Sequence, residues 1–171
     1  DADYLDIIKD TERLVLAVAG DLGLGSSIRY QGHEINLSRP WPRTTVSKAF
    51  RKSADWDPVL RLDPERFDLD LVDKVVPVFP ANRPTVLMDY PAANASMARL
   101  KPGNKKVAER TEVFIAGLEL ANAYSELTDA GELEKRFRQV TDTEAGRPMP
   151  RRFLEAVADM PACGGIALGV D

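Results

Sequence analysis

The sequence predicts an α+β fold in which helices flank a largely antiparallel sheet. Segments with apolar residues at helical spacing are interleaved with segments in which apolar and polar residues alternate. Two of the alternating segments contain two-residue turn signals, Gln31-Gly32 and Ala116-Gly117, which join consecutive strands as hairpins. With 171 residues and no internal repeat or linker, the chain is expected to form one domain.

The first half of the chain is predicted to contain three helices and one hairpin. The helices are expected at 3–22, 46–54 and 63–76, and the hairpin at 28–37. The first helix follows from apolar residues at helical spacing, with Val18 and Leu22 on its apolar face and Gly23 at its end. Thr45 is placed to cap the second helix, and Asp63 or Pro64 to begin the third.

The second half alternates between strands and helices. Strands are expected at 85–90, in a hairpin beginning at Arg110, and at 164–171; helical segments are expected at 92–100, 129–143 and 150–161, with a loop at 146–148. The first strand is a continuous apolar run closed by Pro91. Asp129, with Glu132 three residues later, forms a capping box, and Pro150 suits the first position of a helix.

Three glutamates, Glu112, Glu119 and Glu126, are spaced seven residues apart in an otherwise apolar segment. Glutamate is disfavoured inside strands, and an unpaired buried carboxylate is costly. If Ala116-Gly117 is a two-residue turn, Glu119 lies opposite Phe114 and shares one face of the hairpin with Glu112. These two carboxylates are suitably placed to hold Mg²⁺ against phosphate oxygens.

The third glutamate, Glu126, lies seven residues beyond Glu119, and an odd separation places two side chains on opposite faces of a straight strand. In a straight strand it would point away from Glu119, so it joins the other two only if a bulge or bend lies within residues 121–124. The alternative interpretation is an exposed edge strand whose charges discourage aggregation. The spacing alone leaves both interpretations open.

Four segments resemble class II lysyl-tRNA synthetases and their tRNA-independent relatives. RTEVFIAGLELANAYSELTD, residues 110–129, is similar to a signature of that family. DYPAANASMARL at 89–100 resembles one of its loops, and YQGHEINLSRPWPRTTVSKAF at 30–50 resembles the region upstream. PMPRRFLEAVADMPACGGIALGVD at 148–171 resembles the final helix and motif 3, the strand of the ATP site. The resemblance therefore covers nearly the whole chain.

The resemblance implies roles for eight residues. Glu112 and Glu119 match the pair that coordinates Mg²⁺ bound to ATP, and Gly169 matches a position where the backbone lies close to the adenylate. Positions that match the amino-acid pocket are Asn122, Tyr124, Glu126, Gly165 and Ala167. Glu126 matches the carboxylate that receives the lysine ammonium group, which fits the need of a desolvated cation for an anionic partner.

Ala167 indicates the branch of the family. Ordinary lysyl-tRNA synthetases tend to have glycine at this position, whereas the lysine ligases that modify elongation factor P resemble GIALGVD. One methyl group reshapes amino-acid preference by roughly 1–3 kcal/mol. This branch implies activation of (R)-β-lysine with ATP and its transfer to a lysine of elongation factor P. The alternatives are an ordinary lysyl-tRNA synthetase, with lysine as substrate and tRNA as acceptor, and a non-catalytic binding module.

The chain also departs from the family pattern. It contains no motif 1 and no motif 2, and motif 3 stops at Asp171, where the family continues with an arginine. We therefore expect residues 1–171 to be the C-terminal part of a catalytic domain, inactive alone. The resemblance implies a homodimer only for the full-length protein, since members of the family pair through motif 1. Thr111, Ala123 and Arg151-Arg152 replace residues common in the family.

Composition excludes some other classes of function. A net charge of −4 and a pI near 5.2 argue against a large nucleic-acid surface, and no apolar run is long enough to span a membrane. The single Cys163 cannot form an intramolecular disulfide, so a cytoplasmic location is expected. His33 in the hairpin is expected to be exposed and without a metal.

Overall fold

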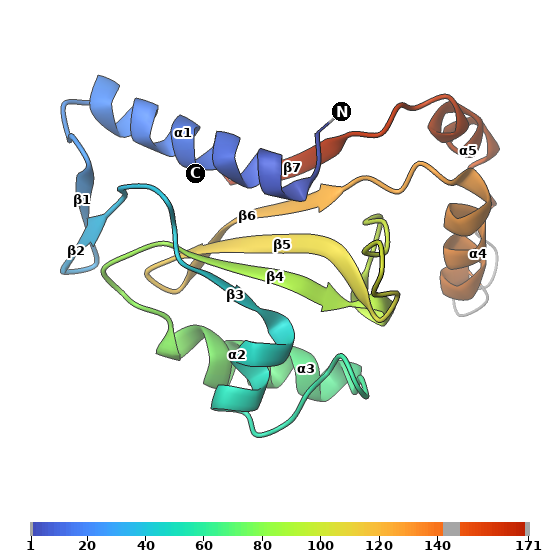
Figure 1. Ribbon diagram of the computed structural model, residues 1–171, viewed down its shortest axis with the longest axis horizontal. Helices are drawn as coiled ribbons and strands as arrows, with labels where there is room; N and C mark the ends of the chain where they lie inside the picture. The colour runs from blue at the N-terminus through green and yellow to red at the C-terminus, as the bar shows by residue number, and fades with distance from the viewer. Residues whose placement is uncertain (1, 142–147, 170–171) are drawn as a thin grey trace.

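A five-stranded sheet forms the centre of the computed structural model, which describes residues 2–141 and 148–169 (Figure 1). In sheet order, the strands are β3 (Arg43–Thr45), β4 (Thr85–Pro91), β5 (Val107–Ile115), β6 (Leu118–Ser125) and β7 (Gly164–Leu168). All neighbouring strands are antiparallel except β3 and β4, which are parallel. The predicted α+β class with an antiparallel-rich sheet is confirmed, and β3, only three residues long, is an unpredicted addition at the edge.

Helices lie on both faces of this sheet and at one end of it (Figure 1). Helix α1 (Tyr4–Asp21) covers one face of the sheet, where it contacts β5, β6 and β7. Helix α2 (Val46–Ser53) packs on β4 from the opposite face, next to α3 (Pro64–Asp70). Helices α4 (Ala130–Thr141) and α5 (Arg151–Ala158) pack against each other at the end of the sheet. No helix within the described ranges is long and apolar enough to cross a membrane.

The predicted caps and the first hairpin are present. The side chains of Thr45 and Asp63 accept hydrogen bonds at the starts of α2 and α3, as predicted. Asp3, which was not predicted as a cap, begins α1 with a complete capping box. Strands β1 (Ser27–Tyr30) and β2 (His33–Asn36) form the hairpin around Gln31-Gly32, and His33 is exposed as predicted.

Other boundaries differ from the prediction. The helix predicted to reach Val76 ends at Asp70, and the chain continues through a wide π turn, η1 (Leu71–Val75), and a tight 3₁₀ turn, η2 (Val76–Val78). Pro77 in the last turn has no N–H to continue an α-helix.

The predicted segment 92–100 contains only the 3₁₀ turn η3 (Ala92–Asn94), β5 begins three residues before Arg110, and Pro150 is the cap rather than the first residue of α5. The predicted end of α4 near Thr143, the residues 146–147 of the predicted loop, and the last two residues of the predicted final strand lie outside the described residues.

Two apolar clusters stabilise the opposite faces of the sheet. Under α1, the buried side chains of Ile8 and Trp41 pack with Val113 of β5. Under α2 and α3, Phe50 stacks on Phe67 with ring centroids 4.8 Å apart, in the cluster that also contains Phe114. Because successive residues of a strand face opposite sides, Val113 and Phe114 define which side each β5 residue occupies.

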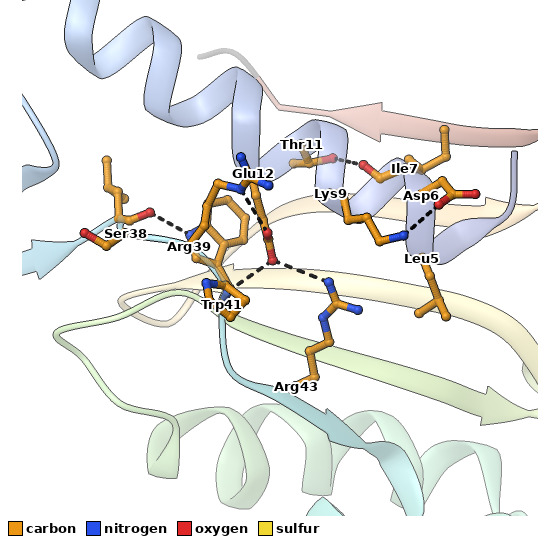
Figure 2. A network of polar contacts seen from close by, with 12 residues as sticks. Leu5, Asp6, Ile7, Lys9, Thr11, Glu12, Ser38, Arg39, Trp41 and Arg43 are labelled. Carbon is orange, nitrogen blue, oxygen red and sulfur yellow. Dashed lines mark hydrogen bonds and ion pairs between the residues drawn. The ribbon is translucent and has the colours of Figure 1, made fainter.

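The apolar face of α1 differs from the prediction in two ways. Val18 and Leu22, expected on the buried stripe, are 49% and 68% exposed. Glu12 occupies the buried stripe instead and is 2% exposed. Its carboxylate accepts a hydrogen bond from the Trp41 backbone N–H at 3.1 Å and lies 3.4 Å from Arg39 Nε and 3.6 Å from Arg43 Nη2 (Figure 2). This network attaches α1 to the segment that leads into β3.

Candidate active site

The β5–β6 hairpin positions the glutamates. Ala116 and Gly117 have φ values of 48° and 82°, both in the left-handed region that a type I′ turn requires. Glu119 lies opposite Phe114, as predicted. The register then shifts so that Val113 lies opposite Ala121, which leaves Leu120 as an extra residue in a β-bulge. Leu120 and Ala121 both contact the α1-side cluster.

The bulge places the third glutamate on the predicted face. The bulge, at Leu120, lies one residue before the range 121–124 in which it was predicted. After the bulge, Asn122 lies opposite Glu112 and Tyr124 opposite Arg110, on the side away from α1. Glu126 continues this alternation just past the end of β6, where it forms a bridge with Ala98.

Strand β7 completes the same face. Ala167 lies opposite Asn122, and Gly165 lies opposite Tyr124. Gly169 follows the strand and donates its backbone N–H to Leu120 O at 2.9 Å. The fold thus gathers the residues predicted to contact the amino acid on one face of β6 and β7, with Gly169 at the edge.

Glu112 is buried and lies in a polar cluster. Its Oε1 accepts hydrogen bonds from Arg110 Nη2 at 2.8 Å and from Asn122 Nδ2 at 3.3 Å. Burial raises the pKa of the Glu112 carboxyl, and the negative charge of Glu119 adds to the rise, while the Tyr90 hydroxyl and Arg110 oppose it. Glu119 lies on the same face of the hairpin, so the two carboxylates are neighbours of like charge.

Glu126 has a different environment. Its side chain is half-buried, burial raises the pKa of its carboxyl, and within residues 2–141 and 148–169 it forms no ion pair. The carboxylate lies directly over Gly165, where an added Cβ would collide with Oε1. A half-buried carboxylate without a cationic partner is suited to receive a cation from a ligand.

A second unsatisfied group belongs to Asn122. Its Nδ2 is bonded to Glu112, but its buried Oδ1 accepts no hydrogen bond from any described residue. A buried acceptor left unpaired costs about 1–3 kcal/mol, so a ligand N–H group or a water molecule would satisfy it. Asn122 and Glu126 therefore both offer acceptor oxygens on the face of the sheet that carries Gly165.

The residues present fit a magnesium ion that also binds phosphate. The described part of the chain contains no group of three or more histidine, cysteine, aspartate or glutamate side chains arranged around a metal. It offers the pair Glu112 and Glu119 on one face, with Glu119 exposed. Since Mg²⁺ is commonly held by one or two carboxylates plus substrate phosphates, this pair suits a metal that arrives with a nucleotide.

Two residues of this cluster were missed by the sequence analysis. The Arg110 guanidinium lies 4.6 Å from the ring centroid of Tyr90 and also binds Glu112. Tyr90 is fully buried beneath this cluster. Arg110 precedes Glu112 by two residues, so strand alternation alone could have placed it on the same face; the contribution of Tyr90 depends on the pairing of β4 with β5.

A separate cleft of about 520 Å³ lies between α4 and the loop after Arg99. Of the predicted site residues, only Glu126 lines it. Its two arginines already have partners: Arg99 pairs with Glu109, and Arg136 binds Glu132 and two backbone carbonyl groups. The cleft is therefore a neighbour of the predicted site rather than the site itself.

An antiparallel sheet flanked by helices, with carboxylate and amide side chains on one face, is the arrangement of a class II synthetase-like domain. The chain belongs to the family of class II tRNA synthetases (D, K and N), which it matches over residues 1–171.

Curated relatives narrow the comparison to lysine ligases. The chain is 35% identical to a lysine–tRNA ligase of Moorella thermoacetica and 31% identical to one of Dehalococcoides mccartyi, in each case over 99% of this chain. It is 44% identical to an elongation factor P–(R)-β-lysine ligase of Klebsiella pneumoniae over 103 residues, which are 57% of this chain and 32% of that protein. The chain spans 39–40% of the length of the two lysine–tRNA ligases.

If Glu126 receives the lysine ammonium group, as the family resemblance implies, Gly165→Ala is expected to weaken lysine binding by the full-length protein by about tenfold, because the new methyl group would displace the Glu126 carboxylate. The measurement is calorimetric titration of the protein with lysine. Gly20→Ala on α1, where the added Cβ meets nothing within 4 Å and φ is helical, is the matched control and should bind lysine normally. Unchanged affinity in Gly165→Ala would show that the position of Glu126 over Gly165 is unimportant.

Proposed function

We propose that the protein containing this chain activates lysine or (R)-β-lysine with ATP to form an aminoacyl adenylate, and that residues 1–171 are the C-terminal part of its catalytic domain. The observation that carries the proposal is the half-buried Glu126 carboxylate, which has no cationic partner among the described residues and shares its face with Asn122 and Tyr124. A lysine ammonium group would supply the missing charge.

In this proposal the site residues divide into two groups. Glu112 and Glu119 would hold the Mg²⁺ that accompanies ATP, and the ion would neutralise charge on the phosphates. Gly169 would lie beside the adenylate. Asn122, Tyr124, Glu126, Gly165 and Ala167 would line the amino-acid pocket. The unpaired Oδ1 of Asn122 supports this division, because it offers an acceptor for an amino group.

For the acceptor, we propose a lysine of elongation factor P. The support is the 44% identity to the elongation factor P ligase over 103 residues, together with Ala167, whose methyl group lies opposite Asn122. The match to lysine–tRNA ligases over 99% of the chain supports tRNA as the second candidate. Calorimetry with (R)-β-lysine and with lysine separates the two, since the first acceptor requires tighter binding of the β-amino acid.

The experiment that tests the activation step is ATP–pyrophosphate exchange by the full-length protein with lysine or (R)-β-lysine. Exchange that depends on either amino acid and on Mg²⁺ is expected. A well-folded full-length protein without exchange would contradict the proposal and favour the non-catalytic binding module.

The chain of residues 1–171 by itself is expected to show no exchange above background. It contains no motif 2, whose arginine and glutamates would grip the α-phosphate and adenine of ATP, and interactions with the phosphates supply much of the stabilisation in such reactions. The same exchange assay checks this, with the full-length protein as positive control. Clear exchange by the isolated chain would show that the residues described here suffice for catalysis.

A further inference from the structure

We propose that Arg110 is a positioning residue that holds Glu112 and Tyr124 in a fixed relation, so that the magnesium carboxylate and the amino-acid pocket are ordered together. The inference rests on the proposed function for the roles of these two partners. It assigns to Arg110 no contact with substrate; the arginine acts through the side chains that it binds.

Arg110 makes four contacts with groups from different parts of the fold. Its Nη2 binds Glu112 Oε1 at 2.8 Å, and its Nη1 donates to the backbone carbonyl of Asn94 at 2.9 Å. The guanidinium lies 4.6 Å from the ring centroid of Tyr90 and 5.9 Å from that of Tyr124. The side chain is only 19% exposed, so these contacts are largely shielded from water.

Electrostatics gives Glu112 a need for this cation. The carboxylate is buried, and Glu119 on the same face is a like charge. A buried carboxylate beside a like charge is costly unless a cation is paired with it. An arginine satisfies this need while its flat guanidinium face packs on an aromatic ring, which a lysine ammonium group cannot reproduce.

The pairing register shows why one residue would order both halves of the site. Arg110 lies directly opposite Tyr124, and Glu112 directly opposite Asn122. Arg110 and Asn122 donate to the same oxygen of Glu112. Removing the guanidinium would therefore take from Glu112 its ion-pair partner and from Tyr124 its cationic neighbour at once.

The test compares Arg110→Gln and Arg110→Lys with wild type in the full-length protein. Two quantities are measured: the Mg²⁺ concentration that gives half-maximal exchange, and the Kd for lysine from calorimetry without ATP or Mg²⁺. Arg13→Gln is the control, because Arg13 also pairs with a carboxylate, at 2.9 Å from Asp10, but is exposed on α1.

Arg110→Gln is expected to raise the Mg²⁺ concentration for half-maximal exchange by about 10- to 100-fold, which is the usual effect of removing a residue that hydrogen-bonds a metal ligand. It should also weaken lysine binding by about fivefold through Tyr124. Arg110→Lys should restore most of the Mg²⁺ response, because the charge remains, but not the lysine affinity, because the stacking is lost. Arg13→Gln should change neither quantity.

Wild-type values of both quantities in Arg110→Gln would overturn the inference. If Arg110→Gln does not fold, the lysine Kd of Arg110→Lys decides, and a wild-type value there overturns it equally. If wild type itself neither exchanges nor binds lysine, the proposed function fails and the inference falls with it. Failure of the inference alone is recognised by an active wild type whose Arg110 variants are also normal.

Discussion

Replacing Glu126 by glutamine in the full-length protein is expected to weaken lysine binding by about 30-fold or more, because losing one partner of a shielded charge pair costs about 2–5 kcal/mol. Within the described chain this carboxylate has no cation of its own, so a bound ammonium group would be its main partner. Calorimetric titration with lysine gives the Kd directly. Glu155→Gln, an exposed glutamate on α5, is the matched control and should bind as wild type does.

The pH dependence of lysine binding provides a second test of Glu126. Burial raises the pKa of this carboxyl above its ordinary value of about 4.3, so the carboxylate becomes protonated and neutral at a higher pH than an exposed glutamate would. Lysine affinity should therefore fall as the pH drops through this raised pKa. In Glu126→Gln the affinity should show no such fall. A similar pH profile in both proteins would show that Glu126 is not the ammonium receiver.

The same raised pKa affects stability with the opposite sign from a salt-bridged carboxylate. Since Glu126 holds its proton more tightly in the folded state, its contribution to stability decreases as the pH rises through the interval between the unfolded and folded pKa values. Glu126→Gln should thus unfold at the same or a higher temperature than wild type near neutral pH. Loss of lysine binding would then reflect recognition rather than unfolding.

Replacing Glu12 by alanine is expected to lower the free energy of unfolding by about 3 kcal/mol. The substitution leaves the buried Trp41 N–H without an acceptor, and Arg39 and Arg43 without their shared carboxylate (Figure 2). Urea unfolding followed by circular dichroism gives the value. Because Glu12 attaches α1 to the segment before β3, its loss should lower the stability of the sheet as a whole.

Two control variants show which contact of Glu12 matters. Asp10→Ala removes an exposed carboxylate from the same helix, which pairs with exposed Arg13, and should cost less than about 1 kcal/mol. Glu12→Gln keeps an oxygen acceptor for the Trp41 N–H and should fall between Asp10→Ala and Glu12→Ala. A Glu12→Ala protein as stable as Asp10→Ala would show that the buried network does not hold α1 in place.

Local signals predicted the parts of the site that depend on the hairpin. The Ala116-Gly117 turn fixed the register that places Glu119 opposite Phe114, because such a turn allows one pairing only. Glu126 could join the other two glutamates only with a bulge, predicted within residues 121–124; the structure has the bulge one residue earlier, at Leu120. The chain itself therefore specified most of the geometry of the three carboxylates.

The features that were missed depend on contacts between distant segments. Nothing local distinguishes β3, which is three residues long and is a strand only because it pairs with β4. The Arg110 side chain is held by contacts with Tyr90 on β4 and with Asn94 in the turn that follows it, and these residues come close to Arg110 only in the folded protein. Glu12 could have been noticed, because it interrupts an apolar stripe four residues after Ile8, but its arginine partners could not.

A crystal structure of the full-length protein with lysine and a non-hydrolysable ATP analogue tests the central claim most directly. We expect the lysine side-chain nitrogen to lie about 3 Å from a carboxylate oxygen of Glu126, over Gly165. Lysine bound elsewhere, or Glu126 paired instead with a cation of the protein, would contradict the assignment of this face of the sheet as the amino-acid site.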